Sequence, residues 1–385
     1  MADEIIERLE AALRLEGEDA AIRIRADYAP LGGPGVKVFP PTYMGPAYHR
    51  EERWDEHGER REICVLDSYQ SQANRIEQAL KAEAERLGLP QLILETEAAG
   101  RTVRISNFDA PHRSRDAYFL DSELDGVRFD DSALGKSSAL VEADSATVAL
   151  EHFPLDLVLG VWDSHRGKRI ATKFPRSYTS EIVAWDPISG TRAATKGDPL
   201  NLPGDSRVPQ AAWRSAATSK GSKRGEVKLS ELGHGMVPSE PVEGKGGVSV
   251  KRICRDAVLS FPSLARFDFP TERGDATAAG RVVLAALALA GDRLAFARAG
   301  LTLRSGCELV LVKEEAAWVG RGGVLEPLEL DPESARALLS EARRRLAACG
   351  VEWNPAPIVV QPTRPLREMI EATFATAETG VEDAG

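Results

Sequence analysis

Amides, a hydroxyl and a guanidinium gather on one face of a predicted helix in the stretch LDSYQSQANRIEQAL (residues 66–80). A period of 3.6 residues places the apolar residues on the opposite face. The polar face consists of Ser71, Asn74, Arg75 and Gln78, and the apolar face of Leu66, Tyr69, Ala73, Ile76 and Leu80. Such donors suit phosphate and ribose oxygens, and a helix N-terminus adds free N–H groups. A helix covered by another protein surface is the alternative, and Asp67, in position to cap the helix, would oppose an anion directly above it.

Positive charge gathers in the middle of the chain, although the net charge of the 385 residues is −10. Residues 1–20 and 371–385 carry most of the excess acid, whereas residues 190–252 hold eleven bases and six acids. Residues 160–176 hold one acid, Asp163, and five bases: Arg166, Lys168, Arg169, Lys173 and Arg176. Gly167 would let the backbone approach a phosphate closely, so this segment is a candidate anion site, with a solvated basic turn as the equal alternative.

A second basic group lies at PHRSR, residues 111–115, with aromatic residues just beyond it. Its members are His112, Arg113 and Arg115. Tyr118 could stack on a base, whereas Phe119 is expected in the core. His112, His165 and His234 could act as general bases in RNA cleavage, but single histidines in polar loops are more often surface hydrogen-bonding residues.

Several function classes are disfavoured by the sequence. The run Asp163-Ser164-His165 cannot form a catalytic triad, because adjacent side chains point in different directions. No HExxH, GxxxxGK[ST] or GxGxxG motif occurs, so a metalloprotease, a P-loop enzyme and a Rossmann enzyme are not expected. The four cysteines form no CxxC pair, which argues against a metal site and a disulfide framework. The acidic N-terminal segment and the short apolar block Val282–Ala290 predict a cytoplasmic chain without a membrane partner.

Apolar periodicity predicts an α+β fold. We expect helices at about residues 3–15, 66–88, 276–297 and 332–349, and strands at 21–28, 91–97, 152–164, 176–186 and 302–315. The order of these elements is that of a ferredoxin-like or RNA-recognition-type sandwich with large insertions, although three helices on one antiparallel sheet would look similar. The predicted divisions are an N-terminal helix (1–24), the first part of a palm (25–189, with an insertion at 107–145), a thumb-like or loop insertion (190–250), the second part of the palm (251–350) and a tail (351–385).

Several long, ordered stretches resemble the backbone subunit, of the RAMP superfamily, of type I-G (formerly I-U) CRISPR interference complexes. These are KVFPPTY (37–43), LDSYQSQANRIE (66–77), HRSRDAYFLDS (112–122), GVWDSHRGKR (160–169), KFPRSYTSEIVAWD (173–186), GHGMVPS (233–239) and GGVSV (246–250). The resemblance covers about residues 25–350. It implies a modified RNA-recognition-motif palm with finger and thumb insertions, copies of which polymerise along a CRISPR guide RNA.

The resemblance also implies which residues bind RNA. Ser71, Gln72 and Arg75 are similar to the pattern on the first palm helix that contacts guide phosphates, with Gln70 in place of that pattern's first serine. The expected RNA-binding residues are Lys37, Gln70, Ser71, Gln72, Asn74, Arg75, His112, Arg113, Arg115, His165, Arg166, Lys168, Arg169, Lys173, Arg176 and His234. Expected partners are the guide RNA, target DNA, further copies of the chain and other subunits of the complex, with no cofactor and no metal.

Two alternatives to a non-catalytic scaffold stay open. In a guide-directed RNA endonuclease, as in related type III complexes, Asp109, Asp116 or Asp121 would be the catalytic aspartate. In a protein-interaction subunit, no residue would touch nucleic acid.

Overall fold

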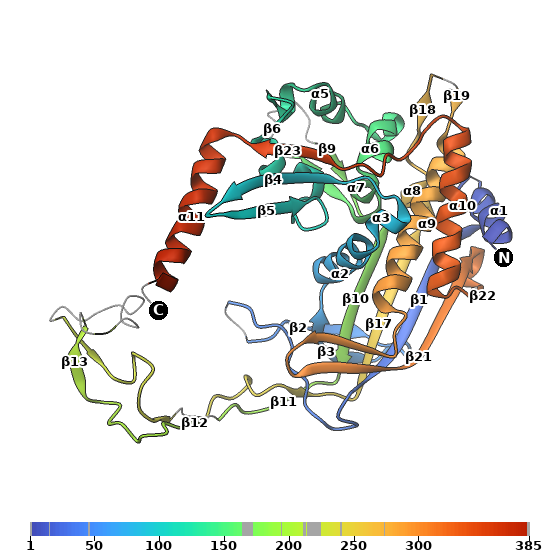
Figure 1. Cartoon of the computed structure of the whole chain (residues 1–385). Helices are drawn as coiled ribbons and strands as arrows, with labels where there is room; N and C mark the ends of the chain where they lie inside the picture. Colours follow the sequence, from blue (N-terminus) through green and yellow to red (C-terminus); the bar gives the residue numbers. More distant parts are fainter. Residues whose placement is uncertain are drawn as a thin grey trace.

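The computed structural model of the chain describes residues 2–14, 16–44, 47–163, 172–193, 195–210, 213, 225–238, 241–272 and 274–382. Within them the protein has two main sheets, of eight and five strands, helices beside each of them, five two-stranded pairs, and a long arm that projects from the larger main sheet (Figure 1). The mixture of helix and antiparallel sheet confirms the predicted α+β class.

The larger sheet contains eight strands among the described residues. Its order is β2 (Arg50–Trp54), β3 (Arg60–Asp67), β10 (Tyr178–Trp185), β17 (Arg252–Ser260), β1 (Asp19–Pro30), β21 (Cys307–Gly320) and β20 (Gly300–Arg304), and β22 (Leu325–Pro327) pairs with β21. All neighbours are antiparallel. Six of the elements follow one another along the chain in the order β1, helix α2, β10, β17, helix α9, β21, with other elements between them, so that sequentially distant strands lie together at the centre.

Helices cover one face of this sheet. They are α1 (Ala2–Ala12), α2 (Tyr69–Ala82), α3 (Ala84–Leu87), α8 (Phe261–Leu264), α9 (Thr277–Phe296) and α10 (Pro332–Ala348). In β1, Ile22 and Ile24 are buried in the main core, whereas Arg23 and Arg25 alternate with them and point to the other face. The run Val282–Ala290 is buried throughout because α9 lies between the sheet and its neighbouring helices.

Close packing of α2 on α9 depends on a small residue. A Cβ at Gly291 would lie 2.6 Å from Ile76 Cγ2, so a larger side chain would push the two helices apart. Ile76 and Leu80 are almost fully buried at this contact. Each such burial contributes roughly 1.5–3 kcal/mol, so the apolar stripe fixes how α2 presents its polar face.

The smaller sheet has the order β5 (Arg101–Ser106), β4 (Leu92–Ala98), β23 (Ile358–Pro362), β6 (Ser122–Leu124) and β7 (Val127–Arg128). Strand β23 pairs parallel with β4 and antiparallel with β6, so a segment expected in a tail lies at the centre of this sheet. The helices α4 (Ala117–Leu120), α5 (Ala133–Ala139), α6 (Thr147–His152), α7 (Pro154–Leu159) and α11 (Arg364–Glu382) belong to this half or join it to the larger sheet (Figure 1).

Residues 190–250 form most of the arm, which leaves between β10 and β17 and extends away from both sheets (Figure 1). Its short antiparallel pairs are β11 (Ile188–Ser189) with β16 (Val248–Ser249), β12 (Thr195–Lys196) with β15 (Val237–Pro238), and β13 (Arg207–Pro209) with β14 (Glu226–Lys228). Val227, Leu229 and Leu232 form a small core of its own. Two further hairpins pair β8 (Val161–Asp163) with β9 (Thr172–Phe174), and β18 (Pro270–Thr271) with β19 (Gly274–Asp275).

Two predicted strands differ from the structure. Residues 152–164 contain helix α7 and only the short strand β8, and Pro154 begins α7 at a position where proline is favoured. A short apolar run that is buried on all sides shows no periodicity, so the sequence does not distinguish a helix from a strand there. Residues 302–315 form parts of two strands, β20 and β21, because the chain turns at Gly306, which has a φ of 75°.

Candidate nucleic-acid interface

Helix α2 begins at Tyr69, after the N-cap residue Ser68, whose Oγ accepts a hydrogen bond from the N–H of Ser71. Asp67 is therefore not the cap, and Leu66 belongs to β3 rather than to the helix. Tyr69 does not join the apolar stripe as expected. It is 42% exposed, and its hydroxyl donates to Glu181 Oε1 at 3.0 Å. The other apolar positions are buried, so the predicted orientation of the helix is correct from residue 73 onward.

Asp67 organises the polar face of α2 from the end of β3. Its fully buried carboxylate accepts from Ser71 Oγ at 2.6 Å and from Arg75 Nε at 2.8 Å. Arg75 also donates to the carbonyl oxygens of Thr302 and Leu303 on β20, at 3.3 and 3.0 Å. These contacts hold a guanidinium, 24% exposed, rigidly at the surface. Two of the polar groups predicted on this face, Ser71 and Arg75, are therefore oriented by a carboxylate of the protein itself.

Gln72 lies inside the protein, contrary to its expected contact with RNA. Its side chain is fully buried, donates to Asp67, and accepts from Ser180 Oγ at 2.6 Å and Arg255 Nε at 3.1 Å. Arg255 is itself paired with Asp292 of α9. Burial would raise the pKa of Asp292, but Arg255 and Arg293 lower it to about 2. Gln72 thus links α2 to the ionic core and has no surface to offer a ligand.

A loop between β1 and β2 carries Lys37 and is tied to the arm and to the turn after β20. Val38 exchanges backbone hydrogen bonds with Val248 at 2.8 and 2.9 Å, and the N–H of Phe39 donates to Gly306 O at 2.9 Å. Arg304 Nη1 donates to Phe39 O at 3.4 Å, and its Nη2 lies 3.7 Å from Asp67 Oδ1. The loop, β20 and α2 are therefore tied together through two arginines. Asp67 and Arg304 were missed by sequence analysis, because their partners are distant in the chain.

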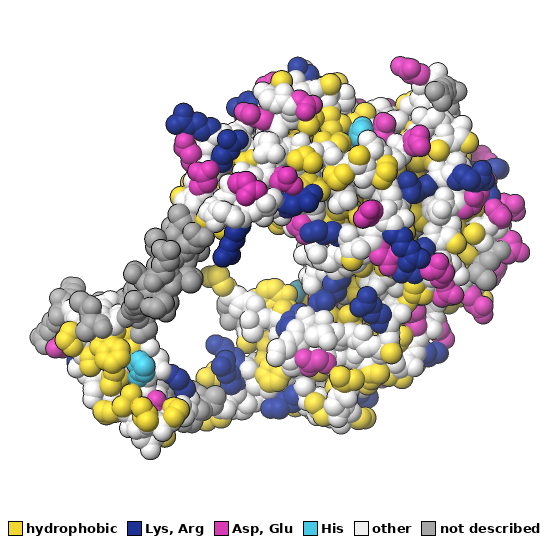
Figure 2. All heavy atoms as spheres, viewed as in Figure 1, with side chains coloured by type: hydrophobic (Ala, Val, Ile, Leu, Met, Phe, Trp, Pro, Cys, Tyr) yellow, Lys and Arg dark blue, Asp and Glu magenta, His cyan; other side chains and the backbone are white. Residues whose placement is uncertain are grey.

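We call this region the α2 surface; it consists of Lys37, Phe39, Gln70, Ser71, Asn74, Arg75 and Arg304. Lys37, Gln70 and Asn74 are exposed, and Phe39 is 39% exposed. Figure 2 shows an opening beside the place where α2 lies in Figure 1, with several Lys and Arg side chains on its described sides. Fixed cations, free amides and an exposed ring are the groups that hold a ribose-phosphate strand.

The opposite flank of α2 shows that two predicted contacts are wrong. Arg113 and Arg115 are 7% and 3% exposed, so neither side chain reaches the surface. Arg113 Nε lies 2.6 Å from Glu77 Oε1, and its Nη1 donates to Gly160 O at 2.7 Å. Arg115 donates to Ser138 Oγ and O at 3.1 and 2.7 Å. These arginines fasten the loop that follows β5 to α2 and α5.

Glu77 is the acid of this buried flank. Burial raises the pKa of its carboxyl to about 7, although Arg113 opposes the shift. Arg176 is half-buried on the same flank, where burial and the charge of Arg113 lower the pKa of its guanidinium. Arg176 is thus separated from Arg75 by the body of the helix.

The remaining predicted residues are dispersed. Lys173 is exposed on β9, with its Nζ 5.8 Å from the ring centroid of Trp162. His112 is exposed, and His234 packs in the arm at 5.3 Å from the ring of Trp213. His165, Arg166, Lys168 and Arg169 lie outside the described residues. Phe119 is fully buried, as predicted.

The three candidate catalytic aspartates lie after β5, and two of them have structural contacts. Burial would raise the pKa of Asp109, but hydrogen bonds from Lys81 and Ser106 lower it to about 2. Asp116 caps α4, accepting from the N–H of Tyr118 at 3.2 Å, while Asp121 is exposed. Within the described ranges, no three His, Cys, Asp or Glu side chains are arranged to hold a metal ion.

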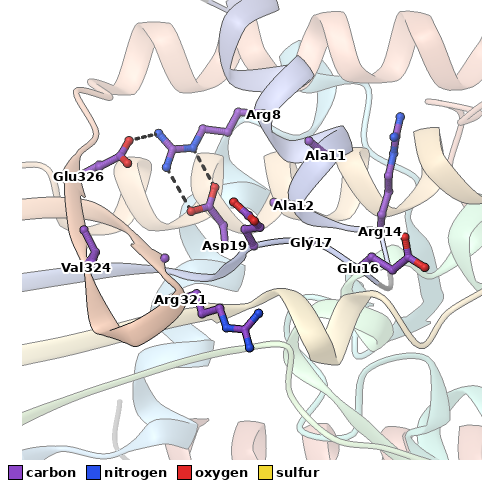
Figure 3. A pocket seen from close by; sticks show the side chains of 12 residues that line it. Arg8, Ala11, Ala12, Arg14, Glu16, Gly17, Asp19, Arg321, Val324 and Glu326 are labelled. Carbon is purple, nitrogen blue, oxygen red and sulfur yellow. Dashed lines mark hydrogen bonds and ion pairs between the residues drawn. The ribbon is translucent and has the colours of Figure 1, made fainter.

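A separate cavity of about 580 Å³ lies between the end of α1 and the turn from β21 to β22 (Figure 3). Arg8 crosses it to Asp19 at 2.8 Å and to Glu326 at 2.7 Å. Carboxylates outnumber guanidinium groups in its lining, so it does not favour a polyanion. It also lies on the far side of the molecule from the opening (Figure 1).

One comparison with known proteins bears on this geometry. Residues 22–188 match the model of a family described as CRISPR-associated protein GSU0053. The chain is similar to a CRISPR-associated family. The matched stretch includes Lys37 and all of α2. No curated protein matches the chain. In the part of the chain that the structure describes, no helix combines the length and apolar character needed to span a bilayer.

Proposed function

We propose that this protein is a non-catalytic backbone subunit of a type I-G CRISPR interference complex, which binds the guide RNA and presents it for pairing with target DNA. In such a complex, base pairing reads the sequence, and the protein holds the backbone of the guide. The observation that carries the proposal is the α2 surface, where Arg75 and Arg304 are oriented by one buried carboxylate beside exposed Lys37, Gln70 and Asn74.

The arrangement of the larger sheet supports an RNA-recognition-type palm within this proposal. Its central strands follow the order β10, β17, β1, β21, and α2 and α9 provide the two helical connections of a β-α-β-β-α-β unit. The arm of residues 190–250 takes the place proposed for the thumb, and further copies of the chain and other subunits are its proposed partners. Arg166, Lys168 and Arg169 stay in the proposal as phosphate contacts.

Expression with a CRISPR array and the partner subunits tests the proposal. We expect the purified protein to carry RNA of uniform length, in assemblies of several copies. Protein that purifies without RNA, and that shows no salt-dependent binding to added RNA, would instead support a protein-interaction subunit.

The endonuclease is the second candidate, since Asp121 is exposed in the segment after β5. The loaded complex is incubated with complementary RNA and magnesium. Intact target RNA is expected from a scaffold, and regularly spaced cuts that disappear in Asp121→Asn would establish the nuclease.

A further inference from the structure

A cavity of about 660 Å³ lies at one end of the larger sheet, where the turn between β2 and β3 approaches β1, β10 and β17. Its lining includes Arg25 of β1, Trp185 of β10 and Arg252 of β17. Arg25 alternates with the core residue Ile24, and Trp185 and Arg252 are cross-strand neighbours. The cavity therefore opens on the sheet face opposite to α2 and α9.

Two tryptophans give the cavity aromatic walls. Trp54 is 71% exposed, which is unusual for so large an apolar side chain. Trp185 is partly buried, packs against the apolar cluster of Ile63 and Val183, and donates from Nε1 to Cys254 Sγ at 3.0 Å. Its ring is thus held in place by the sheet, while Trp54 is free to meet a ligand. Rings of this kind, offered by a sheet, stack on nucleobases.

Most of the charges around the rings are paired with one another, which leaves one base and one acid for a ligand. Arg252 pairs with Asp27 at 3.0 Å, Arg25 with Glu56 at 3.7 Å, and Arg61 with Asp55 at 3.4 Å. Lys251 and Asp186 also line the cavity, and neither has an ion pair within the described parts of the chain. Lys251 can bind a phosphate, and the carboxylate of Asp186 can accept from the amino group of a base. The lining thus holds four Lys or Arg and four Asp or Glu side chains, and the two tryptophan rings, rather than a net charge, favour a nucleotide.

We propose that this cavity binds one unstacked nucleotide of a single-stranded nucleic acid, with the base against Trp54 and Trp185 and the phosphate on Lys251. Its volume lies within the usual range for a small-ligand site. The site is distinct from the α2 surface and lies across the sheet from it. The proposal therefore goes beyond guide binding, and it holds even if the α2 surface has another partner.

The test uses the full chain and a short single-stranded RNA that contains bromouridine. Irradiation should crosslink the RNA to the peptide that contains Trp54 or Trp185, as mapped by mass spectrometry. Crosslinks to the loop of residues 31–44 or to α2 would instead indicate binding at the α2 surface. The experiment can therefore contradict one proposal without contradicting the other.

Affinity measurements with the same RNA provide the second readout. Trp54→Ala should reduce the crosslink at the cavity and weaken binding there about tenfold, because one base stack is lost. Trp54→Phe, which keeps a stacking ring, should retain most of the affinity, and Lys251→Glu should weaken it. Leu140→Ala is the matched control, because Leu140 is 77% exposed on the other half of the molecule. Circular dichroism checks that each variant is folded.

Two results would overturn the proposal. The first is the absence of any crosslink to either tryptophan, together with an unchanged affinity of Trp54→Ala. The second is quenching of tryptophan fluorescence by an arginine-rich peptide but not by RNA, with the quenching lost in Trp54→Ala. That result would assign the cavity to a protein partner.

Discussion

Arg75 and Arg113 are each paired with a buried carboxylate, Arg75 with Asp67 just before α2 and Arg113 with Glu77 within α2. The Arg75 side chain is nevertheless 24% exposed, whereas that of Arg113 is 8% exposed. The difference lies in the partner. Asp67 ends β3 and is bonded to Ser71 and Arg75 of the polar face, whereas Glu77 is paired with Arg113 of the loop after β5 and lies near Asp156 of α7. The position of the paired carboxylate therefore decides whether an arginine of a basic motif is available to a ligand or only stabilises the fold. The following variants test this contrast, from the largest expected effect to the smallest.

At a pH well above the Glu77 pKa of about 7, Arg113→Ala should lower the free energy of unfolding by about 3–5 kcal/mol, because it leaves an ionised Glu77 buried without its partner. Urea denaturation measures this loss. Arg101→Ala, at an exposed position on β5, is the control and should change stability by less than about 0.5 kcal/mol. If Arg113→Ala were as stable as the unaltered protein but bound RNA more weakly, Arg113 would have to be an RNA contact rather than a structural residue.

Glu77 predicts a pH dependence of stability. Burial raises the pKa of its carboxyl from 4.5 to about 7, so the folded state holds a proton that the unfolded state releases. Stability from this group is complete below about pH 4.5 and is lost as the pH rises to about 7, an effect on the order of 3 kcal/mol. Thermal unfolding across this range should show a smaller decline in Glu77→Gln. Equal slopes in the two proteins would contradict the assignment.

Asp67→Asn should affect both stability and binding, since Ser71, Gln72 and Arg75 share this acceptor. We expect a loss of about 1–3 kcal/mol in the free energy of unfolding. RNA affinity at permissive temperature should also fall, because Arg75 is no longer held. Asp121→Asn, an exposed exchange of the same type, should change neither quantity. If the RNA affinity of Asp67→Asn were unchanged, the Asp67 carboxylate would have no role in RNA binding.

Lys37→Ala should leave stability unchanged within about 0.5 kcal/mol and weaken RNA binding uniformly across guide sequences. The slope of log affinity against log salt should decrease by about one, because one phosphate contact is lost. Lys136→Ala, exposed on the other half of the protein, provides the control. A loss confined to one guide sequence would indicate base contact instead.

Sequence patterns were sufficient for the elements that have one clear apolar face or a long apolar run. Helices α2, α9 and α10 and strand β10 lie where the apolar pattern places them, because each has one clear face or a long apolar run. The apolar pattern failed at α7, whose run PLDLVL is buried on every side and carries no period. The donors at residues 70–75 were found because their types are unusual on a helix. Gln72, Arg113 and Arg115 were placed wrongly because their partners Arg255, Gly160 and Ser138 are far from them in sequence.

Strand β23 has a consequence for how the protein is made. It lies between β4 and β6, both of which precede it by more than half the chain. During synthesis, β4 and β5 can pair as a hairpin, but their sheet must wait for a strand that is made more than half the chain later. Until then, the apolar edge of β4 stays open to wrong partners. Assembly of this half is therefore expected to wait until β23 has been made, and to be the step at which a folding helper matters most.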